Sequence, residues 1–440
     1  MRIFCSWRAL VRAGTVALLT SCAWAGAATG AQAASVTAAP GWEVSPLVYP
    51  SHLTPGQRAF IVLAIYNVGK AGSTGPVTVT DTLPAGMTAT EAGYFDEPYI
   101  QSGLPEGNQW NCSLGNVVTC TSTSEGALPS IPPGQMEWLA IAVHVPAGAS
   151  GTALNHAIVS GGGALGPASV SDEVSFSSAP SEFGFQRADS WFSSPDGTLD
   201  TQAGSHPYSL TTSLVLNNTG DNPVSEPRSI TVALPRGLVG NPTSIPRCTS
   251  AQLNDHACPA DTQVGVDRAA LSGPSGFSFA ENETPSIEEF GRDFMIAPEF
   301  PVYNMVPPPG TPAQLGFSFN GLTTSINTKV RSGSDYGISA VINNILQSQI
   351  TFNTLTVWGV PADSSHNFQR DGTNGEGGGI EFHVPSHIAP VPFLTLPTAC
   401  EGPQTFSAST EAWANEGITA PPSEFSFLSH ENWRFCSSRG

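Results

Sequence analysis

The chain has 440 residues and a formal net charge of −19, because 16 lysines and arginines face 35 aspartates and glutamates. Such acidity leaves no positive footprint for nucleic acid or an anionic membrane face, and both partners are excluded. Only 12% of the residues are charged, glycine and proline are abundant, and amphipathic helical patterns are almost absent. This composition is typical of an all-β chain with many turns.

Residues 1–33 have the pattern of a secretory signal peptide. Basic residues precede an apolar stretch, and Ala31-Gln32-Ala33 predicts cleavage after Ala33. The apolar stretch is too short to span a bilayer, so no transmembrane segment is expected. Leu19-Thr20-Ser21-Cys22 resembles a bacterial lipobox, and lipid anchoring through Cys22 stays open as an alternative. We therefore expect a secreted or cell-surface protein.

The rest of the chain divides into a leader over 34–44 and three β-rich regions. Their predicted bounds are 45–178, 183–295 and 296–440, with a linker at Ser177 to Glu182. The last cysteine, Cys436, lies four residues before the end of the sequence, so an incomplete third region also stays open.

The first region contains short alternating runs between turn signals. The best strand candidates are 58–66, 77–80, 117–121, 138–145, 153–160 and 168–176. In the fourth candidate, Leu139, Ile141 and Val143 alternate with other residues, which predicts a half-buried strand. Residues 161–166 match G-x-G-x-x-G, but a further strand follows instead of the helix that a dinucleotide site needs. A hairpin turn is therefore predicted there.

Two stretches of the chain share one plan. An apolar run is followed by an Asn-x-Gly turn, a strand, a Leu-Pro-x-Gly turn and a close cysteine pair. In the first stretch the runs are 60–66 and 77–80, and in the second they are 210–216 and 230–233. The repeat predicts a structural module with its own disulfide, and it implies no particular reaction.

The first region carries further landmarks in a fixed order. They are Asn67-x-Gly69, Val79-x-Asp81-x-Leu83-Pro84-x-Gly86, the Trp110-x-Cys112 to Cys120 hairpin, Leu128 to Gln135, and Asn155-His156-Ala157. In these landmarks, residues 45–178 resemble the bacterial surface-repeat domain known as domain of unknown function eleven. The resemblance implies an immunoglobulin-like sandwich in an exported or surface protein, without catalytic residues. The second half lacks a counterpart of Asp81 and is similar to unassigned exported segments of actinobacteria.

Six cysteines remain after the signal peptide, in sequential pairs. They are Cys112 and Cys120, Cys248 and Cys258, and Cys400 and Cys436. An even number in an exported chain predicts disulfides, and short loops with turn residues favour pairing between neighbours. The first pair predicts a hairpin closed by a cross-strand bond. Zinc is excluded because no C-x-x-C spacing occurs.

Few residues suggest chemistry. His383 and His387 are weak metal-ligand candidates, since period two would place them on one side of an extended segment. Asp363 and His366 could serve a hydrolase, but no third group or oxyanion site accompanies them. The loops 196–200 and 371–376 are rich in oxygen ligands without fitting a calcium motif. No cofactor is expected, and calcium is unsupported.

These observations predict an all-β protein of tandem immunoglobulin-like β-sandwich domains with disulfide-pinned hairpins. We expect an exported, non-catalytic structural or adhesive protein whose partners are cell-surface or matrix components, glycans among them. A carbohydrate-binding module, with or without calcium, is the first alternative. A secreted hydrolase with its site in the second half is the second.

Overall fold

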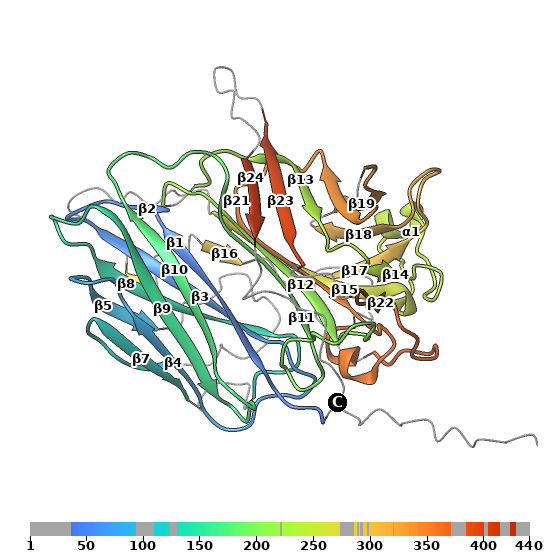
Figure 1. The fold of residues 1–440 in the computed structure, drawn as a ribbon, viewed down its shortest axis with the longest axis horizontal. Coiled ribbons are helices and arrows are strands. Elements are labelled where there is room, and N and C mark those ends of the chain that lie inside the picture. Colours follow the sequence, from blue (N-terminus) through green and yellow to red (C-terminus); the bar gives the residue numbers. More distant parts are fainter. Residues whose placement is uncertain are drawn as a thin grey trace, which may run out of the picture. The chain divides into compact units, whose positions relative to one another are not determined.

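The computed structural model describes residues 37–93, 110–123, 130–220, 222–272, 286–287, 290, 294–296, 299–319, 321–333, 335–370, 384–399, 404–413 and 423–427. Strands dominate these ranges (Figure 1). Within them, no helix has the length and hydrophobicity that a membrane span requires.

Strands β1 to β10 form two facing sheets. The first sheet has the order β1 (Trp42–Tyr49), β3 (Arg58–Asn67), β8 (Met136–His144), β5 (Thr88–Gly93). The second has the order β2 (His52–Leu53), β10 (Ala168–Phe176), β9 (Gly151–Gly161), β4 (Val77–Thr82), β7 (Val117–Ser122), β6 (Trp110–Ser113). All neighbours pair antiparallel except β2 and β10, which pair parallel. The two sheets enclose one apolar core, so this part is a β-sandwich.

The strands predicted for the first region are confirmed with small shifts at their ends. The glycine run after residue 160 is the turn between β9 and β10, as predicted. Gly162 has φ +63°, and a Cβ there would lie 2.6 Å from the Trp42 ring. Only glycine combines that backbone angle with so close an approach.

Strand β3 is buried on both faces. Its odd-numbered residues, such as Ile61 and Leu63, enter the core of the sandwich. Its even-numbered residues, such as Phe60 and Val62, enter a second core on the other side. Strand β8 behaves in the same way, so the prediction that it is half-buried was wrong. A third layer of strands covers the face that was expected to meet water.

The second core joins the sandwich to the rest of the chain through aromatic contacts. Trp138 meets Phe352 edge-on, with ring centroids 5.2 Å apart. Tyr66 meets Trp191 at 5.3 Å in the same geometry. Such pairs stabilise beyond the area they bury. The Tyr49 hydroxyl donates a hydrogen bond to Thr351 Oγ1 at 3.3 Å.

The third layer belongs to a 12-stranded sheet. Its order is β11 (Phe185–Ser193), β12 (Ser209–Leu216), β21 (Ile350–Trp358), β15 (Gln263–Ser272), β17 (Phe300–Met305), β18 (Gln314–Phe319), β19 (Leu322–Val330), β20 (Ile338–Asn343), β13 (Pro227–Ala233), β23 (Phe406–Ala412), β24 (Ser423–Phe427), with β16 (Phe294–Ile296) beside β15. Strands from 183–295 and from 296–440 alternate within this sheet. The predicted bounds of those two regions stay a prediction.

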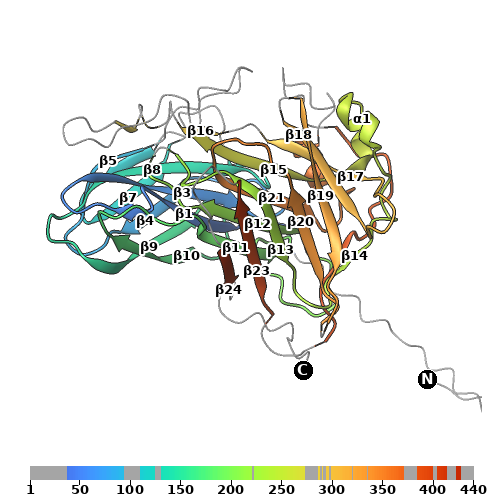
Figure 2. The same cartoon turned by 90° about the horizontal axis from the view of Figure 1, so that it is seen from above.

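This large sheet folds back on itself, since its first strand β11 lies close to β23 and β24 at the far end of the order (Figure 2). Phe185 of β11, Ile230 of β13 and Ala408 of β23 share one apolar cluster. Strands β14 (Val239–Gly240) and β22 (Leu394–Thr395) form a separate pair. The helices whose bounds lie within the described residues are short: α1 (Ser250–Asn254), η1 (Ala260–Thr262) and η2 (Ser364–Gln369).

Two disulfides lie within the described residues. Cys112 and Cys120 face each other across the β6–β7 hairpin, as predicted. Cys248 and Cys258 are also joined, but they flank α1 instead of closing a hairpin. The predicted fold class, all-β with sandwich sheets and disulfides, is confirmed.

A buried polar network adds to the junction between the sandwich and the folded sheet. Arg268 of β15 forms an ion pair with Glu299, and its guanidinium also donates to Gln135 Oε1 at 2.7 Å. Gln369 Nε2 donates to both Glu299 oxygens, at 2.9 and 3.0 Å. Burial raises the pKa of Glu299, and the neighbouring Arg268 opposes that rise. The network pairs polar groups that would otherwise be costly to bury.

Replacement of Trp138 by alanine tests the energetic weight of the second core. We expect a loss of about 3–5 kcal/mol in the free energy of unfolding, the usual cost of removing a buried aromatic side chain. Chemical denaturation followed by circular dichroism measures it. Leu154→Ala is the control, because that side chain is 63% exposed on β9. Equal stability of the two variants would contradict a shared core.

Candidate functional site

Several predicted site residues lie outside the described residues. They are Cys22, Cys400, Cys436 and His383, together with the signal cleavage site at Ala33 and the loop 371–376. These assignments stay predictions.

His387 lies at the surface beside an acidic residue. Its Nδ1 is 3.5 Å from Asp261 Oδ2, and its backbone N–H donates to Asp261 Oδ1 at 2.8 Å. Within the ranges that the structure describes, no group of three histidine, cysteine or acidic side chains is placed to hold a metal ion.

The acidic loop 196–200 forms ordinary turns. Asp196 Oδ1 accepts hydrogen bonds from the backbone and hydroxyl of Thr198, at 3.1 and 2.7 Å. The carboxylate of Asp200 accepts from the Ser205 hydroxyl at 2.8 Å. Since both carboxylates serve as local caps, the loop follows the pattern of Asx turns.

His366 is a structural residue in a stack of rings. Its imidazole lies between Tyr208 and Trp358, with ring centroids 4.7 and 4.5 Å away and nearly parallel planes. Neither ring nitrogen has a hydrogen-bond partner among the described residues. Burial lowers the pKa of His366 to about 3, so the ring is neutral at physiological pH. The Arg370 guanidinium lies over the Trp358 ring of this stack, 5.3 Å from the ring centroid.

Asp363 does not orient His366. Its Oδ2 accepts a 2.6 Å hydrogen bond from Lys70 Nζ of the sandwich. Its Oδ1 accepts from the backbone of Ser365 at 3.0 Å and caps η2. A base that activates a nucleophile needs a hydrogen-bonded orienting group, and this arrangement provides none. The two residues suggested for a hydrolase are therefore close together but have separate structural roles.

Asp81 and Asn155, two landmarks of the family resemblance, lie close together on neighbouring strands β4 and β9. Both are buried. Burial raises the pKa of Asp81 to about 7, and the adjacent Asn155 lowers it in part. Their position inside the sandwich indicates an internal polar contact and not a surface site.

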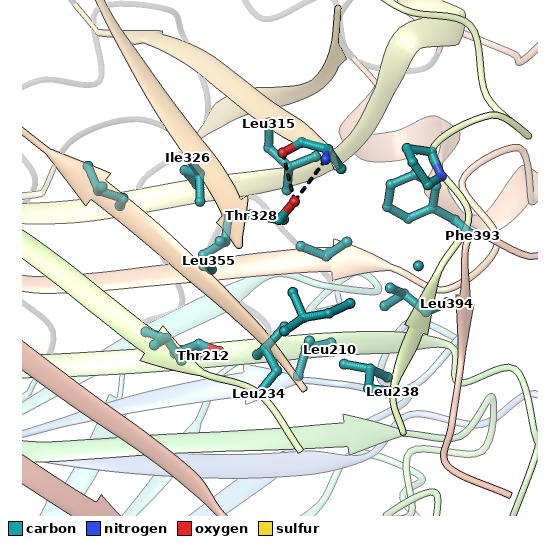
Figure 3. A pocket seen from close by; sticks show the side chains of 18 of the residues that line it. Leu210, Thr212, Leu234, Leu238, Leu315, Ile326, Thr328, Leu355, Phe393 and Leu394 are labelled. Carbon is teal, nitrogen blue, oxygen red and sulfur yellow. Dashed lines mark hydrogen bonds between the residues drawn. The ribbon is translucent and has the colours of Figure 1, made fainter. Parts of the chain in front are cut away.

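The most distinctive hollow of the described chain lies inside the folded sheet. It is a cavity of about 360 Å³ between β12 and β21 on one side and β13, β18, β19 and β20 on the other. Leucine, isoleucine, valine, proline and alanine make up most of its lining. Figure 3 shows Leu210, Leu234, Leu355 and Phe393 around it.

The polar side chains of this lining are largely satisfied by the protein. Thr328 Oγ1 accepts from the Ala313 N–H and donates to the Ala313 carbonyl, both at 2.8 Å (Figure 3). The Thr212 and Ser190 hydroxyls are 2.8 Å apart. The cavity therefore presents hydrocarbon to its contents.

A second, smaller cavity of about 100 Å³ lies next to the first. The two share wall residues, which are Ile230, Ile326, Ile342, Asn353 and Leu355. Asn353 Nδ2 donates to both oxygens of Asp267, at 3.1 and 3.0 Å. Burial raises the pKa of Asp267 to about 8, so this carboxyl is mostly protonated and uncharged at neutral pH.

Sequence reasoning missed this cavity. The one local signal is the alternation in β12, where Leu210, Thr212 and Leu214 line the cavity and the residues between them face the sandwich. Alternation shows which residues share a face of a strand. It does not show that the strands opposite this face are too far away to fill the space between them.

Neither a protein-family model nor a curated protein matches the chain. Among solved structures, the partial N-terminal region of an enterococcal surface protein aligns over 90% of this chain and 96% of its own, at 8% identity and a TM-score of 0.26. The collagen adhesin of S. aureus aligns over 90% and 95%, at 10% identity and 0.20. The Actinomyces fimbrial adhesin FimA aligns over 88% and 95%, at 12% identity and 0.19. At these TM-scores the likenesses carry no argument about function.

The pH dependence of stability tests the role of His366. Its folded pKa lies below that of the unfolded chain, so between about pH 6.5 and 3 the unfolded chain takes up a proton that the folded chain refuses. Wild type should therefore lose stability as the pH falls through this window. His366→Phe keeps a ring in the stack without a titrating group and should lose less, by on the order of a few kcal/mol.

Denaturation at a series of pH values measures this difference. His144→Phe is the matched control, because His144 is exposed at the end of β8. An acid sensitivity of His366→Phe equal to that of wild type would contradict a neutral, buried imidazole.

Proposed function

We propose that the chain is an exported, non-catalytic structural or adhesive protein of the cell surface or the secreted matrix. The burial of strands β1, β3 and β8 on both faces supports this most. It makes the sandwich and the folded sheet one stiff body, which suits a protein that bears load or presents loops at a fixed geometry.

The disulfides support export. Cys112–Cys120 and Cys248–Cys258 are bonds that form and persist in oxidising compartments. A loop as short as the first is expected to contribute about 2–3 kcal/mol to stability. Such cross-links favour long survival outside the cell, because they restrict the unfolded chain.

The proposed partners are surface or matrix components, with glycans among them. Tryptophan rings can stack on sugars. Here Trp358 is buried and the Trp413 indole donates to the Ile345 carbonyl at 2.9 Å, so these two rings give little support to such a platform. We therefore expect surface loops, and not exposed tryptophan rings, to contact these partners.

Location and cross-linking in the native host test the proposal together. We expect the protein in the medium or on the cell surface, with Ala34 as the mature N-terminus and both described disulfides intact. Cell fractionation, N-terminal sequencing and non-reducing peptide mapping measure these properties. If Cys22 carried a lipid instead, the protein would be anchored to the membrane and not freely secreted.

Binding assays separate the alternatives. The secreted protein should bind immobilised cell-wall or matrix material equally well with and without a chelator. Glycan binding that disappears with chelator would favour the calcium-assisted carbohydrate-binding module. A hydrolytic activity that is lost on Asp363→Ala, or a cytoplasmic protein with free thiols, would contradict the proposal.

A further inference from the structure

The cavity inside the folded sheet has the size of a small-molecule site. Its volume of about 360 Å³ falls in the range of roughly 300–1,000 Å³ that is typical of ligand pockets. Protein interiors leave few voids larger than a water molecule, because unfilled apolar space costs dispersion energy. A space this large, formed by side chains from seven strands, is therefore unusual for packing alone.

The shape of the space favours an elongated occupant. The two cavities are neighbours along the sheet and share one wall, which includes Ile326, Ile342 and Leu355. The larger cavity extends from this wall to Phe393 and Leu394 beside β22. An elongated molecule is therefore the occupant that reaches both adjacent cavities.

The chemistry of the lining favours an aliphatic occupant. Among the described residues around the larger cavity, Phe393 is the only aromatic one, so flat rings would find little to stack against. The threonine hydroxyls are already paired, and the Asp267 carboxyl is bonded to Asn353. Hence an uncharged hydrocarbon chain would leave these polar wall groups with the partners that they already have.

The smaller cavity has an apolar rim at the surface. Leu322 and Leu346 line it and are 45% and 50% exposed. Large side chains of this kind at the mouth of an apolar space mark an entrance for a hydrophobic ligand. A polar end group would remain near water at this rim.

We propose that the cavity binds the hydrocarbon chain of a single-chain lipid of the fatty-acid class. The chain lies in the larger cavity and passes the wall of Ile326, Ile342 and Leu355. Its polar end lies at the rim formed by Leu322 and Leu346. The proposal concerns a ligand and does not depend on the adhesive role.

Titration of the full-length secreted protein with parinaric acid, a fluorescent fatty acid, tests this site. We expect saturable binding of one molecule per chain, displacement by palmitate, and a rise in Tm with palmitate concentration, since a ligand that binds the folded state stabilises it. Ala340→Phe places a ring in the cavity and should weaken binding by at least about tenfold.

Ala85→Phe is the matched control, because Ala85 lies in an exposed turn of the sandwich and its substitution should leave the affinity unchanged. Thermal unfolding of both variants shows whether each is folded. Three results would overturn the proposal: no saturable binding to wild type, equal affinity in a folded Ala340→Phe variant, or displacement by phosphatidylcholine vesicles but not by palmitate.

Discussion

The burial of strands β1, β3 and β8 on both faces is the constraint on which the rest of the structure depends. Antiparallel sheets commonly keep one face in water, with a polar residue at every second position. Here Ile61 enters one core and Phe60 the other, so neither face tolerates polar groups without partners. The sandwich can be stable only with a third layer, and the folded sheet provides it.

The same constraint determines where the cavity lies. Strands β12 and β21 have one face against the sandwich, through contacts such as Ser213 with the Tyr66 hydroxyl and Phe352 with Trp138. Their other face lines the cavity, with Leu214 and Leu355. This half of the folded sheet is therefore held in place by the sandwich. The opposite half, formed by β13, β18, β19 and β20, can stand away from it while the sheet remains hydrogen-bonded throughout.

The sequence predicted local features well because local chemistry determines them. The apolar run of β3, the glycine turn at Gly162 and the Cys112–Cys120 hairpin depend on residues close together in the chain. The third layer could not be predicted, since Trp191 and Phe352 are distant in sequence from the strands they cover. Asp363 and His366 suggested chemistry by proximity, but Lys70, which binds Asp363, lies 293 residues away. The cavity, assembled from strands across the second half, has no motif at all.

Native-state hydrogen exchange tests the shared core most directly. If the sandwich and the folded sheet unfold together, the slowest amides of β3, β8, β12 and β21 exchange with one common free energy, equal to that of global unfolding. Protection in β3 and β8 that is lost at a lower free energy than in β12 and β21 would show that the sandwich opens by itself. That result would contradict a single body joined through the doubly buried strands β3 and β8.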